Sequence, residues 1–80
     1  MRISVVPFAR LRDLIGSTEA IDLPAGTTIA QAWEHLVRVH PELAALRAST
    51  RVAQNDRIAV ASDVLREGDE LALLPPSSGG

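Results

Sequence analysis

The sequence predicts an α+β domain in which one main helix and one or two short helices pack against a mixed sheet of four to five strands. Apolar residues form short runs near both ends of the chain, which indicates strands, and recur at helical spacing in the middle. The chain has 80 residues, 46% apolar and 22% charged, which is typical of one small globular domain. We therefore expect a domain over residues 1–74 and a flexible tail over residues 75–80.

The N-terminal third predicts two strands with a short helix between them. In "RISVVPF", Ile3 and Val5 lie on one side of an extended segment. Val6 and Phe8 lie on the other side, so both faces are apolar and the strand is expected to be central. Pro7 cannot donate a ladder hydrogen bond and is expected at the strand's exit. A short helix over "ARLRDLIG" and a second strand over "TEAIDL", paired with the first, follow.

The main helix is predicted over "TTIAQAWEHLVRVHP". Thr28 is a candidate N-cap, and Gln31 three residues later completes the pattern of a capping box. The apolar side chains of this segment form one stripe that would face the sheet: Ile29, Ala32, Trp33, Leu36 and Val37. Trp33 is therefore expected in the core rather than in a ligand site. His35 and His40 are five residues apart and do not share a helix face as a metal pair would, so we expect no metal site.

The last third of the chain predicts a short helical turn over "PELAALRA" and then further strands. Asn55 and Asp56 stand between two short apolar runs and favour a turn. Gly68 marks the turn into a final strand, in which Leu73 and Leu74 face opposite sides.

One main helix covers only one face of a sheet. Phe8, Ile58 and Leu74 are apolar and would lie together on the opposite face if the first and last strands are neighbours. We interpret this uncovered patch as a surface for a partner protein. Two alternatives stay open, that loops cover the patch or that it forms a homodimer.

Charge and composition exclude several classes of function. The formal net charge is −2 and the eight basic residues are scattered, so we expect no nucleic-acid binding. The chain has no Cys, which excludes disulfides and thiol chemistry. No apolar run reaches the ~20 residues that span a membrane, and the N-terminal segment lacks a signal-like core, so we expect no membrane segment and a cytoplasmic location.

The end of the chain, "LLPPSSGG", is typical of a tail that presents its own carboxylate. Pro75-Pro76 would end the last strand and favour a stiff polyproline exit, and Ser77-Ser78 keep the tail polar. At about 3.1 Å per residue, the six residues from Pro75 would project roughly 18 Å. Gly79-Gly80 carry no side chains, so the terminal carboxylate could enter a narrow channel.

A carboxylate becomes reactive when it is activated. Its attack on the α-phosphate of ATP would give an acyl-adenylate that sulfide or an amine can displace. The chain has no Gly-rich phosphate-binding loop and no Lys to complete one, so we expect it to bind no cofactor itself. A separate activating enzyme would supply the ATP site.

Three segments together, "FARLRDLIG", "AQND" and "LREGDELALLPPSSGG", resemble the MoaD/ThiS family of ubiquitin-like sulfur carriers, and within it the small subunits of molybdopterin synthase. The resemblance runs over essentially the whole chain, and its terminal part is the most specific. It implies a ubiquitin-like β-grasp fold. It also implies that the chain is not catalytic alone but is carried between the active sites of other proteins.

The resemblance further implies a reaction and its partners. An E1-like (MoeB-like) adenylyltransferase would adenylate the carboxylate of Gly80, which is then converted to a thiocarboxylate. The sulfur would pass to cyclic pyranopterin monophosphate in the large (MoaE-like) subunit of molybdopterin synthase. Gly79 and Gly80 match the family's reactive tail. The residues expected to bind partners are Phe8, Ile58, Leu74, Pro75, Pro76, Ser77 and Ser78.

Three other functions remain open on the sequence. The sulfur could serve thiamine, cysteine or tRNA thiolation instead. Gly80 could form isopeptides with lysines of other proteins, although a chain without Lys cannot build side-chain-linked polymers of itself. The chain could also be a plain interaction domain with an inert tail. The acidic run Glu67, Asp69 and Glu70 could attract a basic activating enzyme or form a solvated turn.

Overall fold

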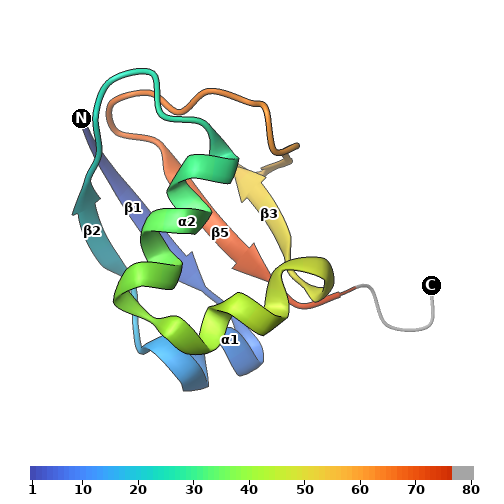
Figure 1. Cartoon of the computed structure of the whole chain (residues 1–80). Coiled ribbons are helices and arrows are strands. Elements are labelled where there is room, and N and C mark those ends of the chain that lie inside the picture. The colour runs from blue at the N-terminus through green and yellow to red at the C-terminus, as the bar shows by residue number, and fades with distance from the viewer. Residues whose placement is uncertain (77–80) are drawn as a thin grey trace.

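Five strands form one mixed sheet in the computed structural model, which describes residues 1–76. They are β1 (Arg2–Pro7), β2 (Glu19–Asp22), β3 (Arg51–Gln54), β4 (Arg57–Ile58) and β5 (Glu70–Leu74). Their order across the sheet is β2-β1-β5-β3-β4; β1 and β5 are parallel at its centre and the other neighbours are antiparallel (Figure 1). The helices are α1 (Ala9–Ile15), α2 (Ile29–Val39) and the 3₁₀ helix η1 (Pro41–Ser49). The predicted α+β class is confirmed.

β1 is central because both of its faces are apolar. Ile3 and Val5 are 1% and 0% exposed and belong to the core under the helices. Pro7 is the last residue of the strand, in register with Leu73 of β5, as expected for a residue that cannot donate to the ladder.

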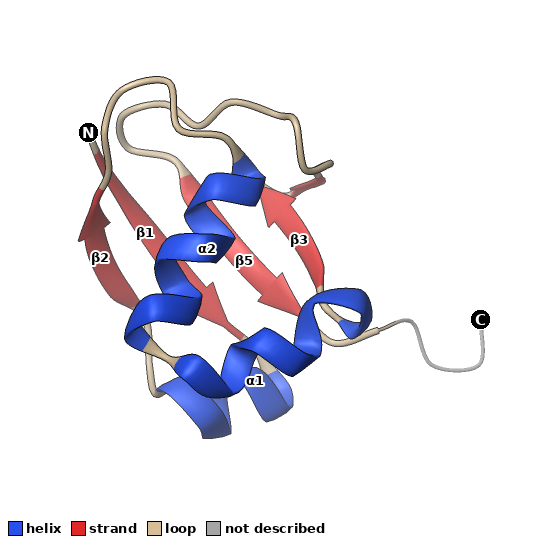
Figure 2. Cartoon of the chain, viewed as in Figure 1, coloured by secondary structure: helices blue, strands red, loops and turns tan. Residues whose placement is uncertain are grey.

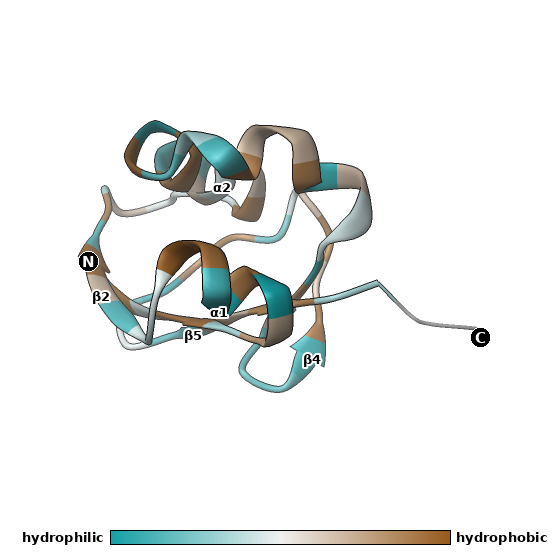
Figure 3. Ribbon diagram, turned by 90° about the horizontal axis from the view of Figure 1, so that it is seen from below, coloured by the Kyte–Doolittle hydropathy of each residue, from teal (hydrophilic) through white to brown (hydrophobic). Residues whose placement is uncertain are grey.

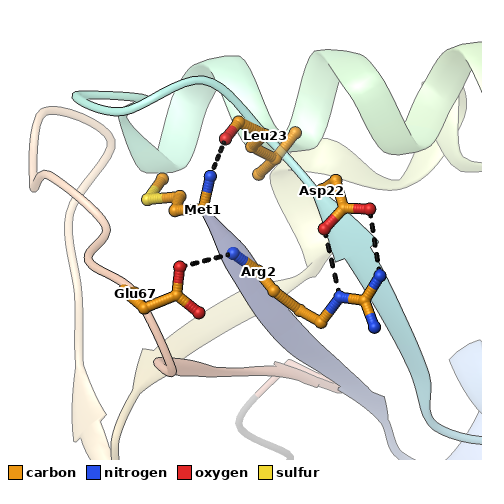
Figure 4. Close-up of polar contacts among 5 residues, drawn as sticks. All are labelled: Met1, Arg2, Asp22, Leu23 and Glu67. Atoms are coloured by element: carbon orange, nitrogen blue, oxygen red, sulfur yellow. Dashed lines mark hydrogen bonds and ion pairs between the residues drawn. The ribbon is translucent and has the colours of Figure 1, made fainter.

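The start of β1 forms hydrogen bonds with the end of β2 and with the turn before β5 (Figure 4). The amino group of Met1 donates to the carbonyl oxygen of Leu23 at 2.7 Å, and the Arg2 guanidinium donates to both carboxylate oxygens of Asp22 at 3.1 Å. The backbone N–H of Arg2 donates to Glu67 Oε1 at 3.1 Å. These bonds join β1 to β2 and to the turn before β5.

α2 crosses one face of the sheet, as Figure 2 shows, and begins with the predicted capping box. The backbone N–H of Gln31 donates to Thr28 Oγ1 at 3.2 Å, and the backbone N–H of Thr28 donates to Gln31 Oε1 at 3.0 Å. The predicted apolar stripe is buried against the sheet at Ile29, Ala32, Trp33 and Leu36, with Val37 partly buried.

No helix within residues 1–76 is long and apolar enough to cross a membrane.

α1 is a short helix of which one side chain, Leu11, is buried. Leu14 is also apolar, but it is 37% exposed. The reason is geometric: Leu11 and Ile15 lie one turn apart on the side that faces the core, and Leu14 lies off that line. Gly16 ends the helix with a φ of 91°, and its N–H donates to the carbonyl of Arg12 at 2.9 Å.

Candidate functional site

Within residues 1–76, no helix covers the sheet face opposite α2 (Figure 3). Leu71 and Leu73 are 1% and 0% exposed beneath the helices, so the alternating residues Ala72 and Leu74 face the other way. We call this surface the open face. Its apolar members are Val6, Phe8, Ala53, Ile58, Ala72 and Leu74.

The strand register aligns part of the open face in one row. Val6 pairs with Ala72, Ala72 with Ala53, and Ala53 with Ile58, so the row crosses four strands from β1 to β4. The two central alanines are 8% and 6% exposed, whereas Ile58 at the border is 61% exposed. The accessible apolar area of this row therefore lies mainly at Ile58.

Phe8 and Leu74 lie beside this row, where β1 and β5 end. The backbone N–H of Phe8 donates to the carbonyl of Leu73 at 3.0 Å, which continues the ladder one residue past β1. Phe8 is 45% exposed and Leu74 is partly buried. β4 is two strands from β5, about 10 Å across the sheet. The register of the strands and the alternation of their side chains place Phe8, Ile58 and Leu74 on one face, as the sequence predicted. Their role in binding stays a prediction.

The predicted tail begins directly at this surface. Pro75 and Pro76 are exposed and follow the last residue of β5, the strand at the centre of the sheet. The predicted partner residues Ser77 and Ser78 and the predicted reactive residues Gly79 and Gly80 lie outside the described residues.

A buried carboxylate, which the sequence places only in the acidic run, joins β5 to the β3–β4 hairpin. Asp69 is 8% exposed and accepts hydrogen bonds from Gln54 Nε2 at 2.7 Å, Asn55 Nδ2 at 2.8 Å and the backbone N–H of Arg66 at 2.8 Å. Asn55 Oδ1 in turn accepts from the backbone N–H of Glu70 at 2.9 Å. The "AQND" and Gly-Asp-Glu segments that resemble the family thus contact each other.

This network sets the charge state of Asp69. Burial raises the pKa of its carboxyl, but hydrogen bonds from Asn55, Gln54 and the Arg66 amide, together with the charge of Arg66, hold the pKa below its ordinary value. On the sequence, the acidic run is interpreted as an attractant for a basic enzyme or as a solvated turn. Neither interpretation fits Asp69, because its carboxylate accepts three hydrogen bonds within the fold. Glu67 is also engaged, as the acceptor for the backbone N–H of Arg2, and Glu70 is exposed.

The aromatic and imidazole groups of the helices have structural surroundings. Trp33 is 7% exposed in the core, and the Arg47 guanidinium lies 5.7 Å from its ring centroid. His40 Nε2 lies 3.2 Å from Glu19 Oε1 and so links the end of α2 to β2. In residues 1–76, no three His, Asp or Glu side chains gather as a metal site would require.

The strand order β2-β1-β5-β3-β4, with a parallel central pair and one helix across one face, defines a ubiquitin-like β-grasp domain. Among its described residues are an open sheet face with apolar side chains and, directly after the central strand β5, the exposed Pro75 and Pro76. The chain belongs to the ThiS family, whose model matches residues 5–80. The family resemblance predicted from the sequence is therefore confirmed.

Relatives of the chain match it over most of its length. A molybdopterin synthase sulfur carrier subunit from Arabidopsis thaliana is 35% identical over 81 residues, which cover 100% of this chain and 84% of the relative. A small archaeal modifier protein 1 from Haloferax volcanii is 35% identical over 82 residues, which cover 91% and 94%. A crystal structure of SAMP1 from Haloferax volcanii superposes with a TM-score of 0.86 at 31% identity and covers 100% of both chains.

Proposed function

We propose that the chain is a sulfur carrier and the small subunit of a molybdopterin synthase. The observation that carries this proposal is the family match over residues 5–80, which includes Gly79 and Gly80. The Arabidopsis relative, named a molybdopterin synthase sulfur carrier subunit, supports the same role over the full length of this chain.

The proposed chemistry takes place at the carboxylate of Gly80. One carboxylate oxygen attacks the α-phosphate of ATP bound by a separate E1-like adenylyltransferase, which releases pyrophosphate and forms an acyl-adenylate. Sulfide then attacks the acyl carbon and displaces AMP, which leaves a thiocarboxylate. In the large subunit, the thiocarboxylate sulfur bonds to cyclic pyranopterin monophosphate, and water cleaves the acyl carbon–sulfur bond and restores the Gly80 carboxylate. This chain supplies the acyl group and the surface that partners hold, but no site for ATP.

The fold supports this proposal through the position of the tail. β5 pairs with β1, and Phe8 lies next to the residue at which β5 ends. A partner that binds the open face would therefore hold the strand from which Pro75 and Pro76 continue. The activating enzyme and the large subunit would use the open face one after the other, because each must reach the same carboxylate.

Sulfur loading tests the proposal directly. The purified chain is incubated with the activating enzyme of the same organism, ATP and a sulfur donor, and its intact mass is measured. We expect the mass to rise by the difference between one sulfur and one oxygen atom. No rise with any activating enzyme of that organism would contradict the proposal. Co-purification with a molybdopterin synthase large subunit would separate this pathway from thiamine, cysteine or tRNA thiolation.

Ile58→Asp is expected to weaken partner binding about tenfold, because it places a charge in the apolar part of the interface. Val60→Asp is a matched control, since Val60 is also 61% exposed but lies outside the sheet. Neither change should alter thermal unfolding appreciably. Calorimetric titration with the large subunit measures the affinity of each variant. Equal affinities for the two variants would show that Ile58 does not lie in the interface.

Protein modification is a second candidate function. The Haloferax relative is named a modifier protein and covers most of this chain. In this reaction a lysine amine of a target protein, rather than sulfur, would displace AMP from the Gly80 adenylate. Gly-Gly remnants from this chain on cellular lysines would support it, and a search that finds thiocarboxylate but no remnants would contradict it.

A further inference from the structure

A groove lies at the root of the tail, between α1, η1 and the end of β5. Its apolar wall is formed by Leu11, Leu46, Pro75 and Pro76, and Arg10 also lines it. The groove has a volume of about 170 Å³. A cavity of about 150 Å³ accepts a benzene ring, so the groove has room for one aromatic or branched aliphatic side chain.

Most polar groups of the groove are already used inside the fold. The hydroxyls of Ser49 and Thr50 donate to the carbonyl of Leu46 at 3.3 and 2.7 Å. Arg10 differs, because it takes part in none of the ion pairs within residues 1–76. Those pairs have Arg2 or His40 as the cation. Among the described residues, no carboxylate lines the groove. The guanidinium of Arg10 therefore has no anionic partner in this part of the chain.

A second guanidinium approaches the tail root from the open face. Arg51 is the cross-strand partner of Leu74, and its Nε donates to the carbonyl oxygen of Pro75 at 3.4 Å. A guanidinium has five N–H donors, so four remain for another acceptor. The groove is on the helix side, because Leu11 belongs to the core there. The tail root thus has Arg10 near it on the helix side and Arg51 on the open face.

We propose that the groove and these two guanidiniums form a docking site for an acidic segment of a partner protein, in which an apolar side chain stands next to Asp or Glu. The inference rests on the proposed function. The apolar side chain fills the groove, and the carboxylate accepts charge-assisted hydrogen bonds from Arg10 or Arg51. Charge complementarity favours this occupant, since the chain as a whole has a net charge of −2 but presents two guanidiniums here.

Docking at this site would act on the tail more directly than binding to the open face. Pro75 and Pro76 form part of the groove wall, so a bound side chain contacts the segment that leads to the reactive end. Holding both prolines fixes the point from which the chain continues, which lowers the entropy cost of presenting a carboxylate to an active site.

Charge reversal at the tail root tests the proposal. The probes are the activating enzyme and the molybdopterin synthase large subunit of the same organism, and affinity is measured by titration calorimetry at several salt concentrations. Arg10→Glu/Arg51→Glu is compared with Arg38→Glu/Arg57→Glu, which changes the net charge equally at two exposed arginines elsewhere. We expect the first variant to bind at least one probe about tenfold more weakly than the second, with a shallower dependence on salt. Circular dichroism checks folding, and Arg10→Gln/Arg51→Gln removes the charges if the reversed variant does not fold.

Equal affinities of the two double variants for both probes would overturn the proposal. A change in self-association instead of partner binding, seen by sedimentation, would also overturn it and assign the groove to a second copy of the chain. Sulfur loading of the wild type is measured separately. Normal loading with equal variant affinities contradicts only the docking site, whereas charge-dependent binding without sulfur loading contradicts only the proposed function.

Discussion

Adding one alanine after Gly80, or deleting Gly80, is expected to reduce thiocarboxylate formation at least about a hundredfold, because a misplacement of about 1 Å at a reacting centre can cost that much. One added residue moves the terminal carboxylate by about 3.5 Å along an extended chain. A channel that fits two glycines would also have to accept a methyl group. Intact mass after incubation with the activating enzyme, ATP and a sulfur donor measures the loss.

The control for this prediction is the same one-residue addition made elsewhere. An alanine inserted between Ser17 and Thr18 lengthens the exposed loop before β2 and leaves the end of the chain unchanged. This variant should gain sulfur at the rate of the wild type. Equal loading of the variant extended after Gly80 would contradict this prediction, because it would show that the reaction does not depend on where the terminal carboxylate lies. No sulfur on either the wild type or the variants would instead favour an interaction domain with an inert tail.

The parts of the fold that local or periodic patterns specify could be predicted from the sequence. Thr28 and Gln31 are three residues apart, and their capping box needs no information from the rest of the chain. β1 could be recognised as central because Val6 is apolar on the face opposite Ile3. The pairing of β1 with β5 does not follow from local patterns, since parallel pairing joins segments far apart in the sequence. Once this pairing is known, the alternation of side chains along each strand places Phe8 and Leu74 on the same face.

The parts that depend on tertiary packing could not be predicted in this way. The groove at the tail root brings Leu11 and Leu46 to Pro75, although no spacing in the sequence relates these three residues. Asp69 is a clearer case: its side-chain partners Gln54 and Asn55 are 15 and 14 residues away. The composition around Asp69 predicts a solvated acidic turn instead. The one indication of its contact with Gln54 and Asn55 is that the Gly-Asp-Glu segment and "AQND" both resemble the family.

Asp69→Ala is expected to lower the free energy of unfolding by about 2–3 kcal/mol, because it removes the charged acceptor of three partly buried hydrogen bonds. Of the three donors, Gln54 Nε2 keeps a second acceptor, the carbonyl of Val64. For a small domain this is a large part of the total stability. The loss would also loosen the β3–β4 hairpin, which carries Ile58 on the open face, so partner binding should weaken as well. Urea denaturation measures the stability and calorimetric titration the binding.

The same network predicts the response of the fold to acid. The folded pKa of Asp69 is lower than that of an unfolded aspartate, which is about 3.9. Its contribution is therefore complete above the unfolded pKa and is lost as the pH falls through the folded pKa. Between about pH 5 and pH 3, the wild type should lose stability more steeply than Asp69→Asn, whose amide cannot titrate.

Asp56→Asn makes the same exchange of carboxylate for amide in the exposed hairpin turn. Asn tolerates the left-handed backbone at this position, where φ is 69°, so the control should keep both the stability and the acid response of the wild type within about 0.5 kcal/mol. If Asp69→Asn shows the same acid response as this control, the carboxylate of Asp69 does not stabilise the β3–β4 hairpin. In that case the backbone pairing of β3 with β5 must hold Ile58 in position unaided.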